Sequence, residues 1–232
     1  MEKAALFWSG GKDSAFALYQ CQLQDQFKVE CLVTTLNETH RRISMHGIRE
    51  ALLDRQAALT GLPLIKMWVP ESPDNSGYER SLMHTFHQLR ESGITTVLFG
   101  DIFLEDLRAY RENLVNAAGL QAGFPLWGRD TGTMVREFLD SGFRTIACAI
   151  STAYLEKDLL GQEISEQFLN RLPPGADPCG ENGEYHTFCF GGPVFREPVK
   201  FRTGEERFVP LEIKTSGGGH NEGFWFVDLI GI

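Results

Sequence analysis

The stretch that most constrains the fold lies near the N-terminus, where two adjacent glycines separate an apolar run from a run of helix-forming residues. Residues 3–8, Lys-Ala-Ala-Leu-Phe-Trp, have the composition of a buried parallel strand, and a helix is predicted from Asp13 to about Gln26. The connection, called the glycine turn below, consists of Ser9, Gly10, Gly11, Lys12, Asp13 and Ser14. A strand, a tight turn and a helix in this order predict one unit of a parallel α/β sheet.

The glycine turn has the residues needed to hold an anion such as a phosphate group. Adjacent Gly10 and Gly11 let the backbone bend tightly and bring its N–H groups against the anion without a Cβ in between. The helix behind the turn adds unpaired N–H groups and the positive end of its dipole. Lys12 adds positive charge, and Asp13 either caps the helix or helps to hold Mg²⁺. The alternative is a plain β-turn with a serine cap.

The better-known phosphate motifs do not occur in the sequence. A P-loop requires Gly-x-x-x-x-Gly-Lys-Ser/Thr, but Lys12 is followed by Asp13, and Gly-x-Gly-x-x-Gly is not found. Ser-Gly-Gly-Lys-Asp-Ser instead resembles the pyrophosphatase loop (PP-loop) of the N-type ATP pyrophosphatases, in the adenine nucleotide alpha hydrolase-like superfamily. There the loop holds ATP phosphates while a substrate oxygen attacks the α-phosphorus and pyrophosphate leaves. The resemblance implies ATP and Mg²⁺, with Asp13 as the candidate metal ligand.

Strand and helix patterns alternate through the first 127 residues. Strands are expected at residues 3–8, 29–35, 64–69, 95–99 and 123–127, and helices at 13–26, 50–60, 78–91 and 105–118. This alternation predicts an α/β fold with a doubly wound, five-stranded parallel sheet, and the resemblance implies its HUP-like form. Such sheets bind ligands outside the carboxyl ends of their strands. We therefore expect adenine against Thr34 and Thr35, and the nucleotide close to Gly100.

The sequence changes character near Gly128. A helix is expected at 131–141, a buried strand at 144–150, two helical pieces within 153–172, and β-like runs at 187–190 and 224–227. We predict an ATP-binding domain at residues 1–127 and a smaller α+β domain at residues 128–232. Residues 37–45 and 70–77 are predicted to be loops. The first, with His46 just beyond it, is either a solvated loop or a mobile segment over a nucleotide or acidic substrate.

Composition excludes several classes of protein. Among 232 residues, 22 Lys and Arg stand against 31 Asp and Glu, a net charge of −9, and stable nucleic-acid binding needs clustered positive charge. No apolar run approaches the roughly 18 residues of a membrane span, and no signal peptide is recognised, so we expect no membrane association. Five irregularly spaced cysteines without Cys-x-x-Cys predict neither a disulfide framework nor a zinc site, and they favour a cytoplasmic location.

The second motif comprises residues 180–187, Gly-Glu-Asn-Gly-Glu-Tyr-His-Thr. Gly180 and Gly183 permit a tight loop, from which Glu181 and Glu184 project carboxylates. Two carboxylates on a short glycine loop can hold a hydrated Mg²⁺ or a substrate ammonium group. The alternative is an acidic turn that leads into a strand.

The two motifs in this order resemble the diphthine–ammonia ligase family, and the likeness covers nearly the whole chain. Members of that family are ATP-dependent amide synthetases that complete diphthamide on elongation factor 2. Further matching residues include Gln56-Ala57, Pro63-Leu64, Gly100, Glu105, Arg108, Glu112, Pro125-Leu126-Trp127, Leu160-Gly161 and Gly192-Pro193. The candidate catalytic residues are Lys12, Glu181 and Glu184. The candidate substrate-binding residues are His46, Glu105, Arg108, Glu181, Gly183, Glu184 and Tyr185.

The sequence departs from the family near the expected acceptor side. Ser44-Met45-His46-Gly47 stands where the family tends to have Met-Phe-His, and Asn182, His186 and Asp101 replace a glycine, an acid and a small residue. These changes concern the acceptor more than the ATP chemistry.

The leading hypothesis is an adenylating amide ligase that uses ATP, ammonia and an acceptor carboxylate, such as one on a modified histidine of elongation factor 2. One alternative is the same chemistry on a different small-molecule or protein acceptor. Another is a non-catalytic sensor that binds an adenine nucleotide. The sequence leaves open the acceptor, the ammonia source and the oligomeric state, including a homodimer.

Overall fold

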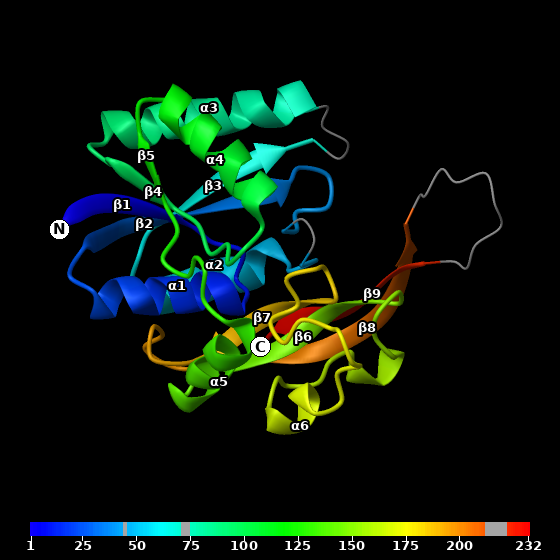
Figure 1. The fold of residues 1–232 in the computed structure, drawn as a ribbon. Helices are drawn as coiled ribbons and strands as arrows, with labels where there is room; N and C mark the ends of the chain where they lie inside the picture. Colours follow the sequence, from blue (N-terminus) through cyan, green and yellow to red (C-terminus); the bar gives the residue numbers. More distant parts are fainter. Residues whose placement is uncertain (44–45, 71–74, 212–221) are drawn as a thin grey trace.

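A five-stranded parallel sheet in the order β3-β2-β1-β4-β5 forms the N-terminal half of the protein (Figure 1). The computed structural model describes residues 1–43, 46–70, 75–211 and 222–232. The strands are β1 (Glu2–Phe7), β2 (Phe27–Asn37), β3 (Leu64–Val69), β4 (Thr96–Leu98) and β5 (Gln121–Gly123). Because β1 pairs with both β2 and β4, the strand order reverses beside it. The carboxyl end of β1 is therefore the expected place for a ligand crevice.

Two helices cover each face of this sheet. α1 (Lys12–Leu23) and α2 (Glu50–Thr60) lie on one face, and α3 (Asn75–Glu91) and α4 (Glu105–Ala117) lie on the other (Figure 1). Each pair of helices has its own buried apolar cluster against the strands. Parallel strands buried on both faces are apolar throughout, which explains why the run at residues 4–6 is fully buried.

The C-terminal half contains an antiparallel sheet of four strands in the order β7-β6-β9-β8. The strands are β6 (Arg144–Ser151), β7 (Tyr185–Gly191), β8 (Phe201–Pro210) and β9 (Gly223–Gly231). Three short helices accompany the sheet, namely α5 (Thr131–Asp140), the 3₁₀ helix η1 (Lys157–Leu159) and α6 (Glu166–Leu169).

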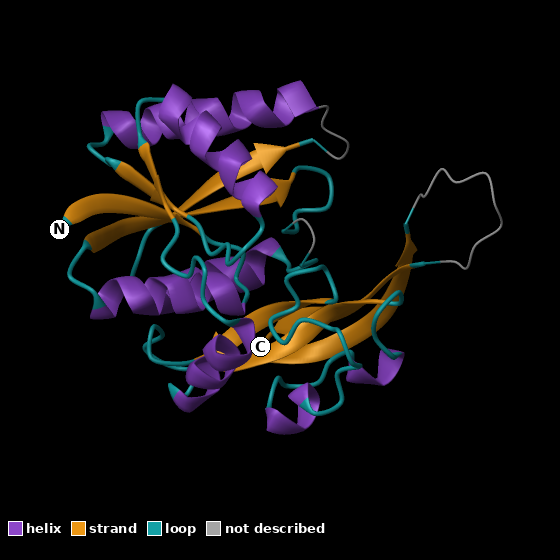
Figure 2. Cartoon of the chain, in the orientation of Figure 1, coloured by secondary structure: helices purple, strands orange, loops and turns teal. Residues whose placement is uncertain are grey.

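Helix α1 lies between the two sheets (Figure 2). Its residues 15–18 are all buried, which is typical of a helix that is covered on every side. Phe16 packs edge-on against Phe138 and Phe143 of the C-terminal half, with ring centroids 5.8 and 6.0 Å apart. One apolar cluster therefore includes residues of both halves, and the second sheet reaches the glycine turn that starts α1.

The predicted α/β class with a smaller α+β part is confirmed, with differences in detail. β2 continues to Asn37, α1 ends at Leu23, and β5 lies at Gln121–Gly123 instead of 123–127. The chain leaves β5 early because Trp127 N–H closes a turn onto Phe124 O and Pro125 has no N–H to donate. The boundary between residues 127 and 128 stays a prediction.

Strand β8 was not predicted. It is an edge strand whose residues from Arg202 to Arg207 are mostly exposed and charged, so they lack the apolar alternation that identifies a half-buried strand. The predicted loop at 70–77 contributes its last three residues to α3. Its residues 71–74, and Ser44 and Met45 of the earlier connection, lie outside the described residues. Within the described ranges, no helix has both the length and the apolar character needed to span a membrane.

Candidate functional site

The glycine turn is held in shape by its own serines. Gly10 has φ +76°, a conformation that favours glycine, and Gly11 N–H donates to Ser9 Oγ at 3.2 Å. Ser14 Oγ donates to Gly11 O at 3.0 Å. These contacts leave the first turn of α1 pointing its N–H groups toward the carboxyl edge of the sheet.

A buried amide joins the turn to the rest of the molecule. Gln56 on α2 is fully buried, and its Oε1 accepts a hydrogen bond from Trp8 Nε1 at 2.8 Å. Its Nε2 donates to Gly10 O at 2.9 Å and to Cys189 O at 2.6 Å. Gln56 therefore links β1, the glycine turn and β7.

Strand β7 also contacts the turn directly. Cys189 N–H donates to Gly10 O at 2.8 Å, and Lys12 N–H donates to Thr187 Oγ1 at 3.0 Å. The second motif continues into β7, so these bonds bring residues about 175 positions apart in sequence to one place. The end of the second motif therefore lies against the glycine turn.

Lys12 is a buried cation surrounded by acidic and aromatic groups. Its Nζ forms an ion pair with Asp13 Oδ1 at 2.6 Å and lies 5.9 Å from the ring centroid of Tyr185. Burial disfavours the charged ammonium group, but the nearby acidic groups, Asp13 first, outweigh burial and raise the pKa of Lys12. Lys12 is therefore protonated and can neutralise added negative charge.

Three carboxylates from different segments influence one another here: Asp13 in the turn, Asp101 after β4 and Glu181 in the second motif. Asp13 and Glu181 also act on Lys12. Burial and then the negative charge of Asp13 raise the pKa of Glu181 to about 8. Burial also raises the pKa of Asp101, although Arg111 lies 3.2 Å from its Oδ2 and opposes the rise. This acidic cluster would be stabilised by an added cation.

The donor set suits a hard cation such as Mg²⁺, which prefers carboxylate oxygens. Within the part of the chain that the structure describes, no three or more His, Cys, Asp or Glu side chains are grouped closely enough to hold a metal by themselves. A magnesium ion at Asp13 would thus need further oxygens from a bound phosphate, which is how Mg²⁺ is commonly held in nucleotide sites.

Glu184 has a different environment from Glu181. It is 1% exposed, and its carboxylate accepts hydrogen bonds from Asp177 N–H at 2.7 Å and from Asn182 N–H at 3.0 Å. Gly180 and Gly183 have φ of +73° and +86°, so the loop needs glycine at both positions. The contacts indicate that Glu184 holds the shape of the second motif. The prediction that it is catalytic stays untested.

Two histidines lie beside the turn. His46 Nδ1 donates to Thr187 O at 2.9 Å, and the His46 and His186 ring centroids are 5.0 Å apart. A Cβ built on Gly11 would lie 2.8 Å from His46 Cε1, so this ring covers the turn closely. Burial lowers the pKa of His46 and lowers that of His186 to about 3, so both rings are neutral near pH 7.

The predicted nucleotide positions Thr34 and Thr35 lie on β2 beyond the level of Phe7, because Phe7 pairs with Val33. Thr34 Oγ1 is buried and has no hydrogen-bond partner among the described residues. Gly100 backs the start of α1, since a Cβ there would lie 3.1 Å from the Asp13 carbonyl carbon. Of these three residues, Gly100 lies directly against the turn. The nucleotide-binding roles of all three stay predictions.

Other predicted residues have their contacts elsewhere. Glu105 is exposed at the start of α4, and Arg108 pairs with Glu112 at 2.7 Å and stacks over Phe124 and Trp127. Tyr185 is buried, and its hydroxyl donates to Pro178 O. Gly183 supplies a turn. Among the described residues, neither Glu105 nor Arg108 is seen in contact with the glycine turn.

Several residues of the site were not among the predicted site residues. Thr187 and His186 follow Tyr185 directly, and only their contacts with Lys12 N–H and His46 show their place. Asp101 could have been predicted from the sequence, because it follows Gly100 directly after a predicted strand, where ligands bind in such sheets. Asp177 accepts a hydrogen bond from Cys179 N–H at 2.9 Å, and no feature of the sequence marked it as part of the site.

The fold and the turn define the class: an α/β protein with a doubly wound sheet and a glycine-rich turn at the end of its central strand. The chain belongs to the diphthamide synthase family. The family's "Diphthamide synthase N-terminal domain" matches residues 1–122, and its "Diphthamide synthase C-terminal domain" matches residues 130–214. The family resemblance predicted from the two motifs is confirmed.

Curated relatives carry the name diphthine--ammonia ligase. The mouse protein (Mus musculus) is 28% identical over 227 residues, which cover 88% of this chain and 84% of the relative. The zebrafish protein (Danio rerio) is 26% identical over 215 residues, covering 82% and 83%. The human protein (Homo sapiens) is 25% identical over 221 residues, covering 86% and 82%.

The raised pKa of Glu181 predicts a pH-dependent effect on stability. Between the unfolded pKa of 4.5 and the folded pKa of about 8, the folded protein binds more protons at this residue, so its free energy of unfolding falls as pH rises. Glu181→Gln removes this loss. We expect the variant to be more stable than the parent at pH 8.5, with a smaller difference at pH 4, measured by urea unfolding. An equal difference at both pH values would contradict the assignment.

Proposed function

We propose that the protein is an ATP-dependent adenylating amide ligase of the diphthine–ammonia ligase type. The observation that carries the proposal is the contact between the glycine turn and β7, in which Lys12 N–H donates to Thr187 Oγ1 and Cys189 N–H donates to Gly10 O. Support also comes from the family match and from the names of the relatives. The acceptor is a carboxylate, and the products are an amide, AMP and pyrophosphate.

In the first step, an acceptor carboxylate oxygen attacks the α-phosphorus of ATP, the α–β phosphoanhydride bond breaks, and pyrophosphate leaves. The buried Lys12 ammonium stabilises the negative charge that develops, together with turn N–H groups other than those of Gly11 and Lys12, which donate to Ser9 and Thr187. Adenine packs against Thr34 and Thr35, and Gly100 keeps the start of α1 free of a side chain. Mg²⁺ held by Asp13 and phosphate oxygens would supply further neutralisation of charge.

In the second step, the nitrogen of ammonia attacks the acyl carbon, the bond from carbon to the AMP oxygen breaks, and the nitrogen loses a proton. Glu181 is the proposed proton acceptor, because its pKa of about 8 lies near the working pH. Ammonium is also attracted by the surrounding carboxylates of Asp13 and Asp101. Glu184 and its backbone partners hold the loop that carries Glu181.

The acceptor proposed first is diphthine, because the relatives carry the name diphthine--ammonia ligase. The resemblance of the two motifs implies that this modified histidine lies on elongation factor 2. The alternatives are another small-molecule or protein acceptor, which the altered His186 and Asp101 would suit, and a non-catalytic nucleotide sensor. A cytoplasmic location is inferred from five cysteines that are all free. A homodimer remains an untested expectation.

The product identity tests the reaction type. Incubation with ATP, an ammonium salt and candidate acceptors should yield AMP and pyrophosphate in equal amounts, together with one amide per AMP. Chromatography of the nucleotides and mass spectrometry of the acceptor provide the measurement. ADP and phosphate as main products would rule out adenylation. Tight ATP binding without turnover on any acceptor would favour the sensor.

The glycine turn should not accept a side chain at Gly11. In Gly11→Ala the new Cβ would meet His46 Cε1 at 2.8 Å and Thr187 O at 3.1 Å, so the turn or its cover must move. We expect ATP affinity to fall by at least about tenfold, because one misplaced contact at such a site costs about 1.4 kcal/mol or more. The matched control is Gly132→Ala in α5, where the nearest atom lies 3.5 Å away. Unchanged affinity in folded Gly11→Ala would refute this use of the turn.

Glu181 and Glu184 should differ when each is changed to glutamine. Glu181→Gln should retain ATP affinity within a few-fold, while amide formation falls by about 10²–10⁴-fold, as for a lost general base. Glu184→Gln places an NH₂ group against backbone N–H donors, so it should lower the free energy of unfolding by about 1–3 kcal/mol. Calorimetric ATP binding, single-turnover assays and urea unfolding separate the two. If Glu184→Gln is stable and loses only amide formation, the catalytic roles must be exchanged.

A further inference from the structure

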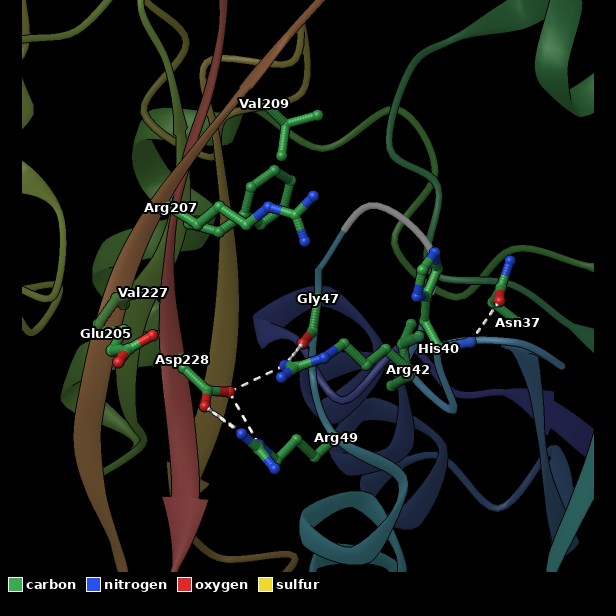
Figure 3. Close-up of a pocket in the computed structure, with 12 residues that line it drawn as sticks. Asn37, His40, Arg42, Gly47, Arg49, Glu205, Arg207, Val209, Val227 and Asp228 are labelled. Atoms are coloured by element: carbon green, nitrogen blue, oxygen red, sulfur yellow. Dashed lines mark hydrogen bonds and ion pairs between the residues drawn. The ribbon is translucent and has the colours of Figure 1, made fainter. Parts of the chain in front are cut away.

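One carboxylate ties the connection between β2 and α2 to the C-terminal sheet. Asp228 on β9 accepts hydrogen bonds from Arg42 Nη1 at 2.8 Å and from Arg49 Nε at 2.9 Å. Arg49 Nη2 makes a second, parallel contact with the other carboxylate oxygen. Arg42 and Arg49 also face each other in an antiparallel bridge. Figure 3 shows that both guanidinium groups point toward Asp228, which therefore joins the two ends of the connection.

This ion-pair cluster is partly shielded from water. The Asp228 side chain is 15% exposed, whereas those of Arg42 and Arg49 are 32% and 48% exposed. Hydrogen bonds from Arg49 and then Arg42 lower the pKa of Asp228 to about 2, so it is ionised at all working pH values. The cluster lines a pocket of about 440 Å³ between the connection and the β8–β9 pair (Figure 3).

The same connection carries His46 to the glycine turn. Arg42 Nη1 donates to Gly47 O at 2.7 Å as well as to Asp228, so one guanidinium holds both groups. Gly47 N–H donates to Ile43 O at 3.0 Å, which fixes its backbone on the other side. His46 directly precedes Gly47, and its ring lies between Gly11 and Thr187 O. A displacement of Gly47 would therefore move the ring that covers the turn.

We propose that Asp228 is a positioning residue for the glycine turn. It fixes Arg42 and Arg49, Arg42 fixes the carbonyl of Gly47, and His46 is thereby held over Gly11. The consequence for ATP binding rests on the proposed function. The consequence for the order of the turn does not rest on it, because every contact from Asp228 to Gly11 is made within the protein itself.

The first test is Asp228→Asn, which removes the charge and keeps the size. We expect the Kd for ATP to rise by about 2- to 30-fold, the range found for substitutions that act through intervening residues. In the protein without nucleotide, amide hydrogens of residues 9–14 should exchange faster with solvent. The matched control is Glu163→Gln, which removes a two-bond ion pair with Arg144 at 2.8 and 2.9 Å on the same sheet. The control should change neither quantity.

A second comparison separates positioning from the loss of an ion pair. Arg42→Gln and Arg49→Gln each remove a partner of Asp228, but only Arg42→Gln also removes the hydrogen bond to Gly47 O. We expect Arg42→Gln to have the larger effect on exchange at residues 9–14 and on ATP affinity. Both side chains are partly exposed, so these variants also serve if Asp228→Asn does not fold.

Unchanged exchange at residues 9–14 in folded Asp228→Asn, or in Arg42→Gln where that variant is needed, would overturn the proposal. A lower free energy of unfolding with unchanged exchange and ATP affinity would show a purely structural ion pair and would also overturn it. If the unmodified protein binds no ATP, the proposed function fails, while the exchange comparison still decides whether Asp228 positions the turn.

Discussion

The side-chain amide of Gln56 is the interaction on which the site depends. Its oxygen and nitrogen bond to Trp8, Gly10 and Cys189, which belong to the end of β1, the glycine turn and β7. Without this amide all three partners would lose a hydrogen bond, and a buried donor left unpaired, such as Trp8 Nε1, costs about 1–3 kcal/mol. Gly10 O would keep the bond from Cys189 N–H. One polar side chain in an apolar interior thus joins the central parallel strand, the glycine turn and the second sheet.

Charge is arranged around this rigid centre so that the site has excess negative charge and one buried lysine. Burial, together with the negative charge of Asp13, raises the pKa of both Asp101 and Glu181, so the fold holds these side chains where their charged forms are disfavoured. Unfavourable electrostatics of this kind are common where a cation or a proton must be received. Lys12 limits the cost, because its ammonium group pairs with Asp13.

Much of the fold and part of the site could be predicted from local sequence. Strand, turn and helix at residues 3–26 are specified by neighbouring residues, and the parallel sheet follows from repetition of that unit. Contacts between distant segments could not be derived in this way. The different environments of Glu181 and Glu184 depend on which carboxylate faces Asp177 and Asn182, and no spacing encodes that choice. Arg108 has a charge suited to binding an acidic substrate, but its guanidinium group stacks over the rings of Phe124 and Trp127 in the N-terminal half.

The order of strands in the second sheet has a consequence for the newly made protein. β9, the last strand in the chain, lies between β6 and β8, so this sheet cannot be completed until residues 223–231 have left the ribosome. Domains commonly begin to fold during synthesis, N-terminal part first. The glycine turn precedes its partners on β7, and Asp228 on β9, by more than 170 residues, so it is made well before them. The N-terminal sheet can therefore form while its glycine turn is still uncovered, and the finished site appears only after β9 has been made.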